Sequence, residues 1–479
     1  MAMTRLIFCW LLLIPLTAPG PAAAAAGKNP AESVVTVVGL DDEGRPSRQG
    51  LGVVVGKDGK VLTSAALLNH CRGGIIRSGA GGMRLIRKVV HWDILQDLAL
   101  VEAGEENLPA SPLNLAPGLR LPEKVGVAVR HDKGIILKEA QVTGRLPFSP
   151  RLVLLKLEPA NLEAEPGAPI ISQRGEVVGM LHAFGGGPAG PGQVRFFLAR
   201  DPKSLPQEKD FKANPQIFSE EPRESPESAA YAAFWEGVAA SLKQEWKGAQ
   251  AKFSAALSLP GSLPEAYYGR GVARYHLKDA RAAQDLLEAT RLLPGYALAF
   301  MWLGQVYDRQ GRPDAAKEAY EKAVSLAPDL SEAQFRLGLF FFQQEKLDQA
   351  RGYLEKAGDD FPQAAQKWWY LGIIARTQNR LPAAREAFDR ALKLDPGFFQ
   401  AYLEEGRLLT EDLGRSQEAV ILLKKAVALN PKHPIARYYL ALAYINTWNR
   451  GEAWKQYFVL QETAPGLAAD LAAVLERGQ

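Results

Sequence analysis

The pattern of apolar and polar positions changes near residue 200. Between about 31 and 200 the apolar residues form short runs rich in valine, isoleucine and leucine, separated by glycine, proline and aspartate, as at 33–40, 51–55, 97–101, 125–129 and 176–181. Such runs predict β-strands joined by turns. From 229 onward the apolar positions recur with helical spacing, which predicts an all-α segment. The stretch 201–228 between them is charged and proline-rich, so we expect a linker there.

The helical segment repeats about every 34 residues. A glycine, replaced by alanine in the last unit, recurs with spacings of 34, 33, 34, 34, 34 and 35 residues at Gly237, Gly271, Gly304, Gly338, Gly372, Gly406 and Ala441. An alanine follows each of them after 12 or 13 residues, and a proline closes each unit. Small residues let paired helices approach closely, and proline ends a helix. The pattern predicts seven units over 229–465.

These repeats resemble the tetratricopeptide repeat family. The resemblance implies seven helix pairs stacked into a right-handed superhelix, with 466–479 as a further helix that caps the last unit. Two units depart from the pattern. The second is one residue short and has Leu287 where an aromatic is usual, and the sixth has an extra residue around 410–415.

Composition excludes several classes of function. The 479 residues, 47% of them hydrophobic, are enough for at least two cores, and 57 basic against 53 acidic residues give a net charge of only +4. Such a balance provides no field that would hold a nucleic acid backbone. The two cysteines and six scattered histidines form no ligand cluster, so we expect neither a metal nor a cofactor.

Residues 1–26 have the layout of a secretory signal peptide. One positive charge precedes an apolar run at 6–16, and small residues with an A-x-A pattern end the segment. The run is too short to cross a bilayer core of about 30 Å, and no other segment approaches about 20 apolar residues. We therefore expect a protein exported to the bacterial periplasm, without a transmembrane anchor, in which Cys71 is the only thiol.

Three stretches of the β-rich segment occur in the order found in trypsin-like serine proteases of the HtrA/Deg type. They are GLGVVVGKDGKVLTS at 50–64, DLALV at 97–101 and EAEPGAPII with RGEVVG at 163–179. The resemblance implies an all-β, trypsin-like double β-barrel over 31–200. It also implies that the position of the peptide-binding PDZ module in that family is taken here by the helical repeats.

The resemblance ends at the catalytic positions. The flanking residues place Ala66 at the histidine position and Pro166 at the serine position, so that only Asp97 of the triad remains. Alanine cannot accept a proton, and proline has neither a hydroxyl nor the backbone N–H that would stabilise an oxyanion. We predict a pseudoprotease in which Asp97 accepts backbone hydrogen bonds. A residual hydrolase with an unconventional nucleophile, such as Cys71 beside His70, is the alternative, although we expect Cys71 to be a buried structural thiol.

The resemblance to tetratricopeptide repeats also implies a ligand groove on the first helices of the units. We expect an apolar groove for an amphipathic helix or apolar segment of a protein partner, with Asp308, Arg376 and Arg407 orienting it. Its predicted lining is Phe234, Tyr268, Tyr275, Met301, Gln305, Asp308, Phe335, Leu339, Phe342, Trp369, Ile373, Arg376, Leu403, Arg407, Tyr438 and Leu442. Replacing both Phe335 and Trp369 by alanine is expected to weaken capture without unfolding.

Three interpretations remain open at this point. The first is a non-catalytic scaffold that binds a protein or peptide, the second is the residual hydrolase, and the third is self-assembly into a homo-oligomer through the aromatic positions. Packing of much of the predicted lining inside the solenoid, or its cover by the barrel or linker, would leave no groove.

Overall fold

A computed structural model describes residues 29–198, except 42, 56–59, 69–70, 80–81, 94–97, 105–112, 114–121, 132–133, 150–151, 159–163, 166 and 182–196, and residues 226–477, except 260–262. The predicted signal peptide at 1–26 lies outside the described residues, as does most of the predicted linker. The chain forms two compact units, Met1–Leu292 and Leu293–Gln479.

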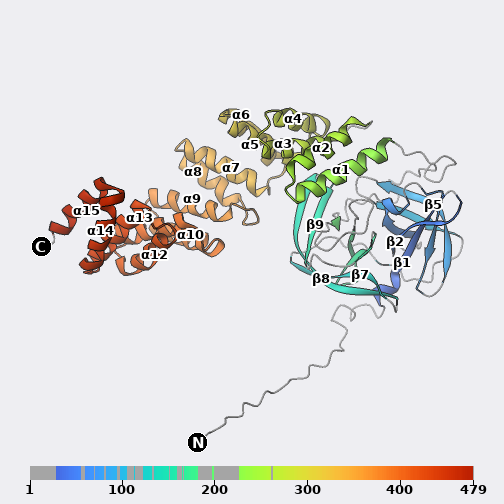
Figure 1. Ribbon diagram of the computed structural model, residues 1–479, viewed down its shortest axis with the longest axis horizontal. Helices are drawn as coiled ribbons and strands as arrows, with labels where there is room; N and C mark the ends of the chain where they lie inside the picture. The colour runs from blue at the N-terminus through green and yellow to red at the C-terminus, as the bar shows by residue number, and fades with distance from the viewer. Residues whose placement is uncertain are drawn as a thin grey trace, which may run out of the picture. The chain divides into compact units, whose positions relative to one another are not determined.

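The first unit contains two closed, antiparallel β-barrels (Figure 1). The first has the strand order β1-β2-β3-β6-β5-β4 and comprises β1 (Val34–Leu40), β2 (Pro46–Val55), β3 (Lys60–Ser64), β4 (Gly73–Arg77), β5 (Met83–Asp93) and β6 (Leu98–Ala103). The second has the order β10-β11-β12-β9-β8-β7 and comprises β7 (Glu123–His131), β8 (Gly134–Ser149), β9 (Leu152–Glu158), β10 (Pro169–Ser172), β11 (Val177–Leu181) and β12 (Phe197–Leu198).

The sequence of β1 is a nearly continuous apolar run because both faces of the strand are buried. Val35 and Val37 point into the core of the first barrel, where they join residues of β3 and β6. Val34 belongs instead to a core shared with the second barrel, which also contains Leu51 of β2 and Val127 of β7. A strand covered on both sides needs no polar alternation. The two barrels therefore pack against each other through buried apolar side chains.

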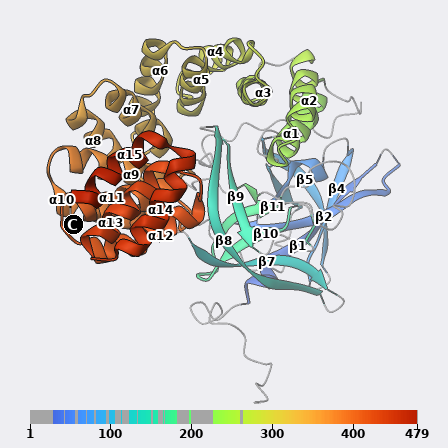
Figure 2. The same ribbon diagram turned by 60° about the vertical axis from the view of Figure 1, so that its left-hand side comes forward.

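Helices α1 to α4 complete the first unit, and α5 to α15 form the second. In the described residues they fall into consecutive pairs, followed by α15. Their bounds are α1 (Pro226–Leu242), α2 (Trp246–Ser258), α3 (Pro264–His276), α4 (Ala282–Leu292), α5 (Ala297–Arg309), α6 (Pro313–Leu326), α7 (Ser331–Gln343), α8 (Leu347–Lys356), α9 (Ala364–Thr377), α10 (Leu381–Leu394), α11 (Phe399–Glu411), α12 (Ser416–Leu429), α13 (Pro434–Asn446), α14 (Arg450–Thr463) and α15 (Pro465–Arg477). Figure 2 shows the last of these helices stacked side by side.

The repeat glycine brings the two helices of each pair into close contact. A Cβ atom at Gly237 would lie 2.7 Å from the ring of Phe253, and Gly304 and Gly372 face Tyr320 and Phe388 in the same way. The second repeat differs at the position where an aromatic is usual, because Leu287 does not face the repeat glycine. Leu286 is buried against Gly271, whereas Leu287 is 48% exposed, because α4 presents the preceding residue to its partner helix.

A residue with positive φ makes the turn inside each helix pair. These residues are Gln244, Lys278, Gly311, Glu345, Asn379, Gly414 and Trp448, with φ between 56° and 69°. The conformation reverses the chain within a few residues, which places the two helices antiparallel. The fold class predicted from sequence, a double β-barrel followed by an all-α solenoid of tetratricopeptide type, is confirmed.

Candidate functional site

The residue at the predicted histidine position lies in a short 3₁₀ helix, η3 (Ala65–Leu67), directly after β3. Ala65 and Leu67 are buried in the first barrel, which fixes the backbone of Ala66 between them. Arg48 Nη1 donates a hydrogen bond of 2.7 Å to the Ala66 carbonyl oxygen. The arginine thus holds the chain at a position where a protease of this fold needs an imidazole.

The segment expected to carry the nucleophile is held between the two barrels. Gly167 has φ +74°, and a Cβ there would collide with the Leu51 carbonyl oxygen of β2. Its N–H donates to Leu181 O at 2.8 Å. Glycine is required here both by the backbone conformation and by the close approach. Pro166, which precedes it, and Asp97 lie outside the described residues, so their predicted roles stay predictions.

A salt bridge that the sequence did not reveal fixes Glu165, which lies two residues before Gly167. Arg130 of β7 binds both carboxylate oxygens of Glu165, at 2.6 and 2.9 Å, and also donates to Thr36 Oγ1 of the first barrel at 3.1 Å. The hydrogen bond that Arg130 donates to Glu165 raises the pKa of the Arg130 guanidinium. A bidentate pair of this kind is among the stronger polar contacts. It orients the segment and links the two barrels.

Cys71 and Ser172, two side chains that could replace the missing nucleophile, are both buried. Cys71 is 5% exposed, as predicted, and burial raises the pKa of its thiol, which disfavours the reactive thiolate. Ser172 is 4% exposed, and its Oγ accepts hydrogen bonds from the backbone N–H groups of Arg174 and Glu176. It therefore shapes the β10–β11 turn. His70 and His182 lie outside the described residues.

The predicted groove lining separates into two sets. Six residues are buried: Phe234, Tyr268, Met301, Gln305, Phe335 and Leu403. These pack inside the array, as one of the open alternatives allowed. Nine are partly exposed, namely Tyr275, Leu339, Phe342, Trp369, Ile373, Arg376, Arg407, Tyr438 and Leu442, and Asp308 is exposed. Phe335, only 1% exposed and part of the core around α7 and α8, is unsuitable for a test that must leave the fold intact.

Four partly exposed apolar residues of the second unit form what we call the aromatic stripe: Leu339 and Phe342 of α7, and Trp369 and Ile373 of α9. Tyr370 connects the two helices, since its ring lies 5.0 Å from that of Phe342 and 4.7 Å from that of Trp369, both edge to face. Trp369 and Ile373 also pack on the residues around Leu408 of α11. The stripe therefore rests on a rigid base.

The charged residues expected to orient a ligand have partners within the chain. Arg376 lies 2.6 Å from Asp412 Oδ2 and 2.6 Å from Glu411 Oε2. Arg407 pairs with the same Glu411 carboxylate at 2.9 Å and lies over the ring of Tyr439. Asp308 accepts a hydrogen bond of 2.6 Å from the Tyr320 hydroxyl. Each of the three side chains thus already has a partner within the chain, and its predicted role in orienting a ligand stays a prediction.

Together with Glu404, these residues form what we call the charged cluster: Arg376, Glu404, Arg407, Glu411 and Asp412. The nearest Arg376 nitrogen lies 3.6 Å from Glu404 Oε2. Burial is the main cause that raises the pKa of Glu404, and the neighbouring arginines oppose it. The acidic members were missed because the family pattern singles out only one face of each helix.

An aromatic side chain of the second barrel occupies the predicted groove positions of the first two repeats. Phe148 of β8 packs edge to face on Phe234 of α1, with ring centroids 5.7 Å apart, and on Tyr268 of α3, at 5.2 Å. It belongs to the same apolar cluster as Trp235 and Phe253. The barrels and these two repeats lie within one compact unit. This part of the predicted groove is filled by the chain itself.

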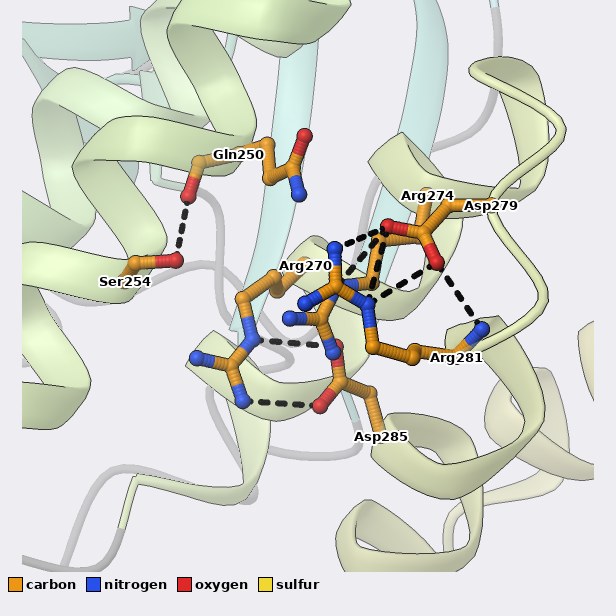
Figure 3. Close-up of polar contacts among 7 residues, drawn as sticks. All are labelled: Gln250, Ser254, Arg270, Arg274, Asp279, Arg281 and Asp285. Atoms are coloured by element: carbon orange, nitrogen blue, oxygen red, sulfur yellow. Dashed lines mark hydrogen bonds and ion pairs between the residues drawn. The ribbon is translucent and has the colours of Figure 1, made fainter.

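The second repeat contains a buried network of charges (Figure 3). Asp285 of α4 is 3% exposed and accepts hydrogen bonds from Arg270 and Arg274 of α3, at 2.7 to 2.9 Å. Asp279 pairs with Arg281, which lowers the Asp279 pKa to about 2. Arg270 directly precedes the repeat glycine, where the third, fourth, fifth and seventh repeats have leucine. Arg270 thus takes a position that is apolar in four of the other repeats.

The sixth repeat also has a charged residue directly before its repeat glycine, Glu405 of α11. It is 2% exposed, and its Oε1 lies 3.9 Å from Arg385 Nε. Its Oε2 has no hydrogen-bond partner among the described residues. Burial first, and then the charge of Asp389, raise the pKa of Glu405 to about 8. A carboxyl group in this setting is costly when it is ionised.

Comparison with known proteins supports the two-part organisation. A family profile for a trypsin-like peptidase domain matches residues 50–180, and one for a tetratricopeptide repeat matches 279–331, 303–364, 335–397 and 401–450. The chain therefore contains a trypsin-like peptidase domain and tetratricopeptide repeats. No curated protein matches the sequence.

Several solved structures are similar to parts of the chain. Pseudomonas aeruginosa PilF is 20% identical, with 44% of this chain and 96% of that chain covered and a TM-score of 0.40. YrrB, described as a TPR protein with an unusual peptide-binding site, is 20% identical over 40% of this chain and 99% of its own, with a TM-score of 0.37. The Rv3671c protease from M. tuberculosis is 18% identical over 44% and 96%, with a TM-score of 0.32. TM-scores this low support no conclusion about function.

Proposed function

We propose that this chain, in which a trypsin-like peptidase domain precedes tetratricopeptide repeats, is a non-catalytic scaffold that holds an apolar segment of another protein. The observation that carries the proposal is the aromatic stripe. Its four side chains stay partly exposed on neighbouring first helices, whereas Phe234 and Tyr268, the residues equivalent to Trp369 in the first two repeats, pack on Phe148. Aromatic side chains on a rigid base are typical anchors of protein interfaces.

The stripe suits a short apolar segment, either an amphipathic helix or an extended strand. Tyr370 contacts both Phe342 and Trp369 edge to face, so the positions of these rings are fixed before a partner binds. Preorganisation of this kind lowers the entropy cost of association. Alanine at Phe342 or Trp369 removes part of the contact surface, and we expect each variant to bind the partner at least tenfold more weakly.

The test is affinity capture of partners from a periplasmic extract by the wild-type chain and the two alanine variants. A matched control is Trp448→Ala, because Trp448 is 88% exposed and lies in the turn between α13 and α14. A partner lost from both stripe variants but kept by Trp448→Ala would support the proposal. Equal capture by all four proteins would refute it, and recovery of the chain alone would favour self-assembly.

We further propose that the peptidase domain does not cleave peptides. The support is the residue types at the catalytic positions, Ala66 and Pro166, together with the burial of Cys71 and Ser172. The purified chain should neither cleave casein nor react with a fluorophosphonate probe for active serines. Labelling by the probe would instead favour the residual hydrolase.

We also propose export to the periplasm, on the basis of the layout of residues 1–26. Among the described residues no helix is long and apolar enough to cross a membrane. Cell fractionation of a producing bacterium tests the location: the mature chain should begin near residue 27 and leave with the periplasmic fraction. A full-length chain in the cytoplasm would contradict this.

A further inference from the structure

The charged cluster directly continues the aromatic stripe. Trp369, Ile373 and Arg376 are spaced by four and three residues along α9, which places them on one face of the helix. Arg376 then contacts Glu404, Glu411 and Asp412 of the next pair. A chain that lies along α9 over the stripe therefore reaches the level of Arg376 about 10 Å beyond Trp369.

The cluster carries one more negative than positive charge. Its three carboxylates, from Glu404, Glu411 and Asp412, face two guanidinium groups, from Arg376 and Arg407. Both guanidinium groups bind Glu411 closely, at 2.6 and 2.9 Å, and Arg376 also binds Asp412 at 2.6 Å. Glu404 has the longest contact, 3.6 Å. The excess charge is therefore concentrated at Glu404.

From this charge imbalance we infer that the segment held by the stripe carries a lysine or arginine about three residues beyond its apolar anchor, and that this cation binds beside Glu404. This spacing is that of an extended segment, because an extended chain advances about 3.3 Å per residue whereas a helix advances only about 1.5 Å. The inference rests on the proposed function and adds the chemistry of the partner. The cost of burying the Glu404 carboxylate, visible in its raised pKa, is reduced when a second cation arrives.

Selection from a random peptide library displayed on phage tests the inference, with the full chain as bait. Wild type should enrich peptides with an aromatic or large aliphatic residue followed three or four positions later by lysine or arginine. Glu404→Gln should keep the apolar preference and lose the basic one. Glu386→Gln is the matched control, since Glu386 is an exposed acid of α10 whose charge is removed in the same way.

Synthetic peptides from the selection measure how much the basic residue contributes to the binding affinity. Replacing the basic residue by glutamine should weaken binding to wild type about tenfold in fluorescence polarisation, and less than twofold to Glu404→Gln. The tenfold difference should also shrink as salt is added.

The two proposals fail in different ways. Apolar enrichment that is lost in Trp369→Ala, but shows no preference for basic residues or prefers acidic ones, would overturn the inference and leave the scaffold proposal standing. Absence of any enrichment, or enrichment that Trp369→Ala does not change, would overturn the proposed function and the inference with it.

Discussion

Replacing Glu405 by leucine should stabilise the sixth repeat, and the gain should grow as the pH rises. Glu405 is 2% exposed, and the equivalent residues of four other repeats, Leu303, Leu337, Leu371 and Leu440, are buried leucines. A leucine has a similar volume and needs no hydrogen bond, so the packing around α11 can be kept. The substitution removes an ionisable group from a site that disfavours its charge.

The sign and size of this pH-dependent gain in stability follow from proton linkage. The folded-state pKa of Glu405 is about 8, above the ordinary value of 4.5, so the folded state binds the proton more tightly. Its contribution to stability is fully present below pH 4.5 and is lost as the pH rises through about 8. Each pKa unit corresponds to about 1.4 kcal/mol, which gives an upper limit of roughly 5 kcal/mol above pH 8 and roughly 3 kcal/mol at pH 7.

Hydrogen exchange measured by mass spectrometry provides a local assay, because repeats unfold partly independently. In wild type, protection of the amides of α11 should fall by about two orders of magnitude between pH 5.5 and pH 8.5, after correction for the intrinsic exchange rate. Glu405→Leu should abolish this fall. The control Glu386→Leu changes an exposed acid of the neighbouring helix and should retain it.

Two results would refute the reasoning. If wild type and Glu405→Leu show the same dependence on pH, the carboxyl group does not titrate in the range that its burial implies. If the leucine variant is less protected at pH 8.5, the contacts of Glu405 with Arg385 are worth more than the burial costs.

Three further predictions concern the other features of the molecule. Phe335→Ala should lower the free energy of unfolding by about 3–5 kcal/mol, whereas Phe342→Ala should cost about half as much because its ring is partly exposed; chemical denaturation compares them, and equal losses would contradict the assigned packing. Gly167→Ala should destabilise the first unit by at least 2 kcal/mol in thermal unfolding, because of its positive φ and the contact with Leu51; an unchanged midpoint would disprove that contact. Cys71 should react with a thiol reagent only after denaturation, and rapid reaction in the native state would show that the thiol is accessible.

The positions that recur in each repeat were predictable from the sequence, because the two helices of every repeat pack against each other at equivalent positions. The glycine of each unit, or the alanine that replaces it, and the alanine 12 or 13 residues later recur about every 34 residues, and this spacing locates the helices. This spacing does not locate Leu286. Its repeat is one residue short, and counting from Gly271 selects Leu287, although α4 turns the preceding leucine toward its partner helix.

The surroundings of the predicted groove residues were less predictable, since they depend on contacts between residues that are distant in the sequence. The family pattern identified Arg376, but its acidic partners on α11 lie 28 to 36 residues further along the chain and outside the expected lining positions. Phe148 could not be found at all, because it belongs to a β-strand and its partners to helices more than 80 residues away. No periodicity links such residues, and only the folded chain brings them together.

The packing of Phe148 against the first two repeats has a consequence for how the protein can be divided, in the laboratory or in evolution. The visible change from strands to helices suggests a cut near residue 229, but such a fragment would leave Phe234 and Tyr268 without the aromatic ring that covers them. An exposed aromatic surface of this kind favours aggregation. A fragment that ends at Leu292 keeps this contact, so we expect the barrels and their first two repeats to remain folded when they are produced together.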